Sequence, residues 1–257
     1  MEVFLNPDAW IALLTLTFLE IVLGIDNIIF ISIATGKLPI ESRKKATKIG
    51  MFLAMFMRIA LLFGINLLIQ MKEPWFTIDL RWLSAGITGQ SIILLLGGLF
   101  LIYKSTSEIR EKVDVKGHEE KELGKAATKS FRSVLLQIIM IDLVFSFDSI
   151  LTAVGMTNGV PGALYIMITA VVISVLIMMQ FAVPVGSFVN KNPSIQILGL
   201  SFLILIGFML LTESAHLSNA LIFGSHVTPV PKGYLYFAIS FSLMVEIINM
   251  KASKKKK

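Results

Sequence analysis

The sequence predicts an all-α polytopic membrane protein with seven transmembrane helices, arranged as two inverted three-helix repeats followed by a seventh helix. Three observations lead to this prediction. Of the 257 residues, 55% are hydrophobic and only 16% are charged, which is unlike a soluble domain. Apolar runs long enough to cross a bilayer alternate with charged segments. Finally, one acidic motif occurs twice, each time inside an apolar run.

The seven predicted spans are the apolar runs between clusters of charge. They cover about residues 10–34, 48–70, 83–103, 131–155, 162–188, 195–213 and 233–250. Most Lys and Arg residues gather in the loops at 36–48 and 104–132 and in the C-terminal tail. The positive-inside rule then predicts an outer N-terminus and a cytoplasmic C-terminus. The net charge of +6 is explained by this pattern, so no nucleic-acid partner is expected, and the location is the inner (cytoplasmic) membrane.

The repeated motif reads EIVLGIDNIIF at 20–30 and DLVFSFDSILT at 142–152. A shift of 122 residues superposes Glu20 on Asp142 and Asp26 on Asp148. A weaker match relates GGLFLIYKS at 97–105 to IGFMLLTES at 206–214. Each unit holds three spans, an odd number, so the second unit must enter the membrane with the opposite polarity, as in many secondary transporters.

These matches predict four segments of the chain. Residues 1–104 form the first repeat, and residues 131–214 form the second. Residues 105–130 join them as a charged, partly helical cytoplasmic linker. Residues 215–257 hold the seventh helix and a basic cytoplasmic tail.

Carboxylates at membrane depth are energetically costly, so two matched pairs point to a function. On a helix, Glu20 and Asp26 lie about 9 Å apart along the axis and about 120° apart around it. If both are to reach one ion, the helix must unwind or kink between them, which Gly24 permits in the first copy and Ser146 tolerates less readily in the second. By contrast, Glu20 and Asn27 share one face, at positions i and i+7.

The motifs offer carboxylate, amide and hydroxyl oxygens, which suit hard divalent cations. The candidate metal ligands are Glu20, Asp26, Asn27, Asp142, Asp148 and Ser149. About six oxygen donors fit octahedral Mn²⁺ better than Ca²⁺, and Mg²⁺ gives up its waters reluctantly. An excess of acids would favour proton coupling. Candidate supporting groups around the ligands are Arg58, Gln180, Asn66, Glu246 and Asn249.

Several alternatives remain open at this stage. The acids could form a structural polar cluster that holds helices together, and Arg58 could be either their counter-ion or a charge that moves as the ion enters. An enzyme is not expected, because no predicted span contains a His and the chain has no Cys. Another alternative is a non-transporting membrane factor that assists metal loading or maturation of envelope proteins. The oligomeric state stays undetermined.

The segments EIVLGIDNIIF, DLVFSFDSI, GGLFLIYKSTSEI and PKGYLYFAISFSLMVEIIN together resemble the TerC family of integral membrane proteins. The resemblance runs from the first span to the last and is closest to the short form without appended cytosolic domains. It implies a seven-span fold akin to the amino-acid-exporter superfamily. It also implies manganese export, with the acids of the two motifs as ligands.

Overall fold

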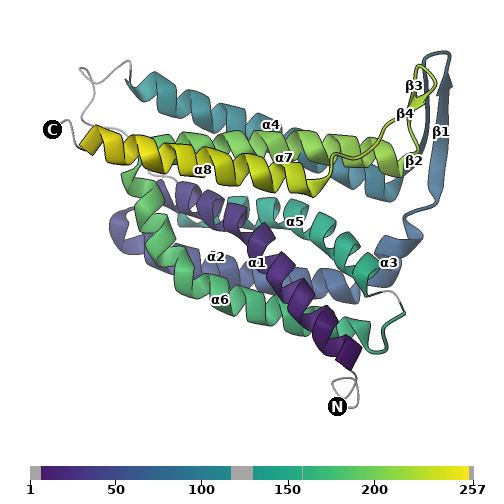
Figure 1. Ribbon diagram of the computed structural model, residues 1–257, viewed down its shortest axis with the longest axis horizontal. Coiled ribbons are helices and arrows are strands. Elements are labelled where there is room, and N and C mark those ends of the chain that lie inside the picture. Colours follow the sequence, from purple (N-terminus) through teal and green to yellow (C-terminus); the bar gives the residue numbers. More distant parts are fainter. Residues whose placement is uncertain (1–6, 117–129, 158, 255–257) are drawn as a thin grey trace. The chain divides into compact units, whose positions relative to one another are not determined.

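The computed structural model describes residues 7–116, 130–157 and 159–254 (Figure 1). The helices are α1 (Pro7–Gly36), α2 (Ile40–Phe63), α3 (Ile65–Gln70), α4 (Gly89–Lys116), α5 (Phe131–Met156), α6 (Ala163–Lys191), α7 (Pro193–Leu217) and α8 (Lys232–Lys254). The strands are β1 (Pro74–Leu80), β2 (Leu83–Thr88), β3 (Leu221–Ile222) and β4 (Ser225–His226). Within the described ranges, seven helices are long and apolar enough to cross a membrane. The predicted all-α polytopic fold is confirmed, while its orientation and repeats stay predictions.

Two predicted spans differ from the helices at their ends. The second span breaks at Gly64, whose N–H donates to Ala60 O at 3.1 Å, and α3 continues as a separate short helix. Glycine is a poor helix residue, so the break falls there. The third span begins later than expected, at Gly89. Its start is fixed by a reciprocal cap, in which Thr88 N donates to Ser91 Oγ and Ser91 N donates to Thr88 Oγ1.

The division between the fifth and sixth spans is a single residue, Asn192. Pro193 follows it and occupies the first turn of α7. Proline has no N–H, but the N–H groups of the first turn have no acceptor within the helix, so no hydrogen bond is lost there. Proline also keeps the preceding residue out of the helical region, so α6 ends at Lys191. In the linker predicted at 105–130, α4 continues as far as Lys116, as the partly helical prediction requires, and residues 117–129 lie outside the described residues.

A small antiparallel sheet in the order β1-β2-β3-β4 was not expected from the sequence. The strands are short and lie in segments that read as span ends or loops. β1 is rich in aromatic and β-branched residues, which favour strands. Phe223 and Gly224 both have positive φ and form the two-residue turn between β3 and β4, a geometry that matches the twist of a hairpin.

The chain folds into two compact units, each of which takes helices from both halves of the sequence. Unit 1 comprises Met1–Leu67 and Lys125–Lys191, and therefore holds α1, α2, α5 and α6. Unit 2 comprises Leu68–Gly124 and Asn192–Lys257, and holds the sheet with α4, α7 and α8. In unit 1, α1 packs along α6, and α2 packs on α5 and α6. Helices matched by the predicted repeats thus fall in the same unit, although the repeat boundaries remain untested.

In unit 2, the closest helix packing is between α4 and α7. A Cβ built on Gly98 would lie 2.7 Å from Gly207 O, and a Cβ built on Gly207 would lie 2.9 Å from Gly98 O. These two glycines are equivalent in the weaker repeat match, GGLFLIYKS against IGFMLLTES. Small residues of this kind let membrane helices approach closely.

Candidate functional site

Both motif helices continue through the acidic motif without a break, because α1 is helical from Pro7 to Gly36 and α5 from Phe131 to Met156. Neither helix is unwound at Gly24 or Ser146, so the condition under which both acids of a motif would reach one ion is not met. Gly24 has a packing role instead, since the side chain of Met178 on α6 occupies the space beside it. With the helices intact, the two acids of each motif point in different directions, as the helical spacing requires.

The first acids of the two motifs meet at Arg58 inside unit 1. Arg58 on α2 donates through Nη1 to Glu20 Oε2, and its Nη2 lies 2.7 Å from Asp142 Oδ1. The Nε atom of Arg58 also lies 3.2 Å from Asp142 Oδ2. All three residues are at most 5% exposed. A cation of the protein itself thus holds together two motif-equivalent carboxylates from α1 and α5.

Two further polar groups complete the surroundings of Asp142. Asn27 donates from Nδ2 to Asp142 Oδ1 at 3.2 Å, and Ser146 donates from Oγ to Asp142 Oδ2 at 3.0 Å. Glu20 and Asn27 therefore lie on one face of α1, as their spacing predicted. The other amide atom of Asn27, Oδ1, is buried and has no hydrogen-bond partner among the described residues.

A small cavity of about 20 Å³ lies beside this cluster. Its lining includes Arg58, Asp142 and Asn27, together with Gly24 and Met178. A cavity of about 10–15 Å³ already holds one water molecule, so this one has room for a single water-sized species. The unpartnered Asn27 oxygen makes the cavity chemically suited to a polar or cationic occupant rather than an apolar one.

The remaining predicted ligands lie away from the Arg58 cluster. Asp26 is 8% exposed and has no hydrogen-bond or ion-pair partner in the described part of the chain. Asp148 is half-buried on α5, and Ser149 donates to Ser146 O at 3.3 Å. Across the described ranges, no three His, Cys, Asp or Glu side chains are grouped closely enough to hold a metal ion. The structure thus gathers Glu20, Asn27 and Asp142, but not all six candidates.

Of the five predicted supporting groups, only Arg58 lies at the cluster. Gln180 is exposed on α6 although the repeat register pairs it with Arg58, and Asn66 is exposed on α3. Glu246 and Asn249 belong to α8 in unit 2 and so to the other compact unit.

Sequence reasoning missed two contributors to the cluster. Ser146 is not among the predicted ligands or supporting groups, although its i+4 spacing from Asp142 on a helix is the signal that could have identified it. Met178 is not among the predicted site residues, and no feature of the sequence marks its contact with Gly24. The fit between Gly24 and Met178 keeps α1 and α6 in close contact beside the cluster.

Replacing Gly24 by Ala should destabilise unit 1, because a Cβ there would lie 2.0 Å from Met178 Sδ. We expect a loss of about 1 kcal/mol in the free energy of unfolding, at the low end for overpacked cores, because the crowding atoms belong to the flexible end of the Met178 side chain. Adding Met178→Ala to Gly24→Ala should restore part of the lost free energy of unfolding. Gly155→Ala is the control, since a Cβ at Gly155 meets nothing within 4 Å. Thermal unfolding in detergent measures all four proteins, and equal midpoints for Gly24→Ala and Gly155→Ala would contradict the packing role.

Comparisons with known proteins place the chain among bacterial membrane proteins. Residues 5–257 match the integral membrane protein TerC family. The chain is 46% identical over 250 residues to the UPF0053 inner membrane protein YgdQ of Escherichia coli (strain K12), covering 97% of this chain and 96% of YgdQ. It is 44% identical over 246 residues to a UPF0053 protein of Haemophilus influenzae, covering 96% and 95% of the two chains.

A longer relative is also similar. The chain is 41% identical over 254 residues to the UPF0053 inner membrane protein YoaE of Escherichia coli (strain K12), covering 99% of this chain but 45% of YoaE. No solved structure matches the chain.

In the part of the chain that the structure describes, seven membrane-length helices and a charged cluster buried between three of them define a polytopic integral membrane protein. The match over residues 5–257 shows which kind: the chain belongs to the TerC family, a membrane protein family implicated in ion or metal transport. Like its relatives with inner membrane names, it is a multi-pass protein of the inner membrane. The family resemblance drawn from the motifs is confirmed.

Proposed function

We propose that this protein is a secondary transporter that exports divalent metal ions, Mn²⁺ above all, across the cytoplasmic membrane. One observation carries the proposal. Glu20 and Asp142, the first acids of the two motifs, converge on one buried point in unit 1 and bind a cation there, the Arg58 guanidinium. Charged groups at membrane depth are costly and commonly mark ion pathways.

The donor atoms around this point suit a hard divalent ion. Carboxylate oxygens come from α1 and α5, and Asn27 adds an amide oxygen that lacks a protein partner. The adjacent cavity of about 20 Å³ has room for one ion or water. Oxygen ligands favour Mg²⁺, Ca²⁺ and Mn²⁺, whereas thiolate ligands would be needed to favour softer metals, and the chain has no Cys.

The ion and Arg58 would compete for the same oxygens. A divalent ion that binds Glu20 and Asp142 must displace the guanidinium, because two cations cannot share these carboxylates without strong repulsion. The second acids, Asp26 and Asp148, then supply oxygens about 9 Å further along their helix axes. Ions would move between the set of Glu20 and Asp142 and the set of Asp26 and Asp148 as the inverted repeats open alternately to the two sides of the membrane. Acids that hold no metal ion would bind protons, which makes the proton the coupling ion.

Flux measurements test the proposal and its ion preference. In everted membrane vesicles, the wild-type protein should transport Mn²⁺ faster than Ca²⁺ or Mg²⁺, because each set of acids supplies fewer oxygen donors than the six to eight that Ca²⁺ takes, and Mg²⁺ dehydrates reluctantly. Cells without their own manganese exporters should survive high Mn²⁺ and hold less of it when they express the protein. The triple variant Arg58→Met, Glu20→Gln, Asp142→Asn is the inactive control, because it removes both carboxylates without leaving the buried Arg58 unpaired.

Two results would contradict the proposal in different ways. If calcium or magnesium moves while manganese does not, the ligand count is wrong. If a folded protein moves none of the three ions, a non-transporting membrane factor becomes the better reading.

A further inference from the structure

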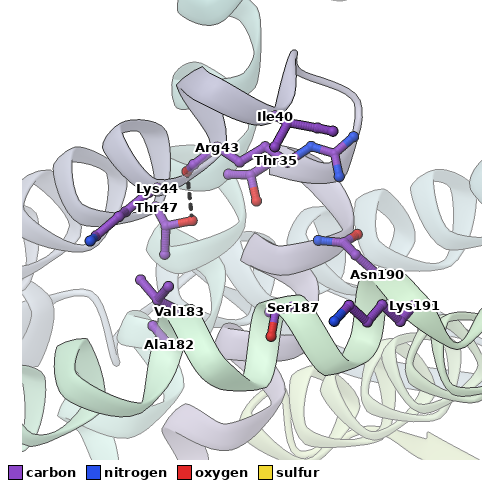
Figure 2. A pocket seen from close by; sticks show the side chains of 11 residues that line it. Thr35, Ile40, Arg43, Lys44, Thr47, Ala182, Val183, Ser187, Asn190 and Lys191 are labelled. Atoms are coloured by element: carbon purple, nitrogen blue, oxygen red, sulfur yellow. Dashed lines mark hydrogen bonds between the residues drawn. The ribbon is translucent and has the colours of Figure 1, made fainter.

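A second, larger cavity in unit 1 lies where α1 ends, α2 begins and α6 ends (Figure 2). Its volume is about 380 Å³, within the range of small-molecule sites. Figure 2 shows residues of α2 on one wall, and Ala182, Val183, Ser187 and Lys191 of α6 on the other. The transport site does not include this cavity, because none of its lining residues belongs to the acidic cluster.

The charged lining of this cavity is entirely basic. Arg43, Lys44 and Lys191 contribute three positive charges, and none of the described lining residues is acidic. Arg43 is held in place because its Nε donates to Leu38 O at 2.8 Å, which leaves its two terminal nitrogens without a hydrogen-bond partner in the described part of the chain. Lys44 and Lys191 likewise have no carboxylate partner among the described residues. Such a lining repels a divalent cation and attracts an anion.

The rest of the lining and the location indicate which anion. Ala182 and Val183 form an apolar wall, and Ile40 at the edge is 80% exposed. The cavity lies at the ends of three membrane-length helices, and part of its lining comes from the segment at 36–48, which the positive-inside rule assigns to the cytoplasmic side. Basic pockets between transmembrane helices on that side suit anionic lipid headgroups, since the phosphate meets the cations and the acyl chains remain against apolar surface.

We infer that this cavity binds the phosphate headgroup of an anionic phospholipid, held by Arg43, Lys44 and Lys191. The chemistry shared with a free phosphate ion is the pairing of phosphate oxygens with these cations. A lipid differs because it also uses the apolar wall and the exposed Ile40.

Lipid binding to the purified full-length protein tests this inference. The probes are phosphatidylglycerol, phosphatidylcholine and inorganic phosphate, and the readouts are native mass spectrometry and the thermal unfolding midpoint. Phosphatidylglycerol should bind and stabilise more than the other two. Each lysine near an anionic lipid surface contributes about fivefold in affinity, so Lys44→Gln with Lys191→Gln should weaken phosphatidylglycerol binding about 25-fold.

Two further variants separate binding inside the cavity from general attraction to the protein surface. Lys45→Gln with Lys48→Gln removes the same charge from exposed positions of α2 that do not line the cavity, and it should retain wild-type binding. Ser187→Trp fills the cavity from an exposed position without changing charge, and it should also abolish the preference for phosphatidylglycerol.

Three outcomes would overturn the inference. Equal losses in the two lysine pairs would mean general surface attraction. Binding of inorganic phosphate that matches phosphatidylglycerol would mean a site for a soluble anion. Unchanged binding in Ser187→Trp would place the lipid outside the cavity. None of these readouts depends on metal flux, so the lipid-binding inference can fail or hold whether or not the protein transports metal ions.

Discussion

Arg58→Met is expected to destabilise the protein by about 3–5 kcal/mol, the usual cost of removing one partner from a buried ion pair. Without the guanidinium, Glu20 and Asp142 would face each other as buried, unpaired carboxylates. Thermal or denaturant unfolding in detergent measures the loss.

The triple variant Arg58→Met, Glu20→Gln, Asp142→Asn is the matched control. It removes all three charges together, and replacement of a whole buried ion pair by neutral groups is commonly close to neutral for stability. The triple variant should therefore recover most of the loss while remaining inactive in transport. If Arg58→Met alone unfolds at the wild-type midpoint, the ion pair does not stabilise unit 1, and Arg58 is free to serve only the ion pathway.

Asp26→Asn should reduce metal flux by about 100-fold or more while the protein still folds. Loss of groups that merely support a metal ligand already costs about 10–100-fold, and the proposal makes Asp26 a ligand itself. Folding should be retained because Asp26 has no hydrogen-bond or ion-pair partner among the described residues, and Asn has nearly the same shape. Flux in everted vesicles at matched expression provides the measurement.

Asp79→Asn serves as the control for this change, since Asp79 is exposed on β1 and should tolerate the substitution with no effect on flux. Wild-type flux in Asp26→Asn would remove this acid from the mechanism and leave only Glu20 and Asp142 as candidate carboxylates. Loss of folding in Asp26→Asn would instead indicate that the acid has a structural partner outside the described residues.

The helices were largely predictable because the signals that determine them are local. A run of apolar residues predicts a span from its length alone, and all seven predicted spans correspond to helices. The ends were less accurate, since hydropathy continues through positions where capping stops the helix. Thr88 and Ser91 show this, because their reciprocal bonds start α4 at Gly89, six residues after the predicted start of the third span at residue 83. The sheet escaped prediction because its segments have the hydropathy of span ends and loops. Its two local hairpins, β1–β2 and β3–β4, are joined only by the β2–β3 pairing between segments far apart in the sequence.

The candidate site was predictable only within one helix at a time. The spacing of Glu20 and Asn27 placed both on one face of α1, and both lie at the cluster. By contrast, the repeat register pairs Arg58 with Gln180, yet Arg58 is buried and Gln180 is exposed. Two residues at equivalent repeat positions can therefore differ in burial, because the rotation of each helix about its axis depends on how its own side chains pack against neighbouring helices.

The sequence by itself determined the membrane class and the spans that carry the four motif acids, since hydropathy depends on local composition. Only the tertiary structure decided that Arg58 joins Glu20 to Asp142 while Asp26 stays apart. It also decided that Gly24 remains helical, with Met178 packed against it. These outcomes depend on how neighbouring helices are rotated and set against one another, and the packing of side chains from distant parts of the chain fixes that rotation.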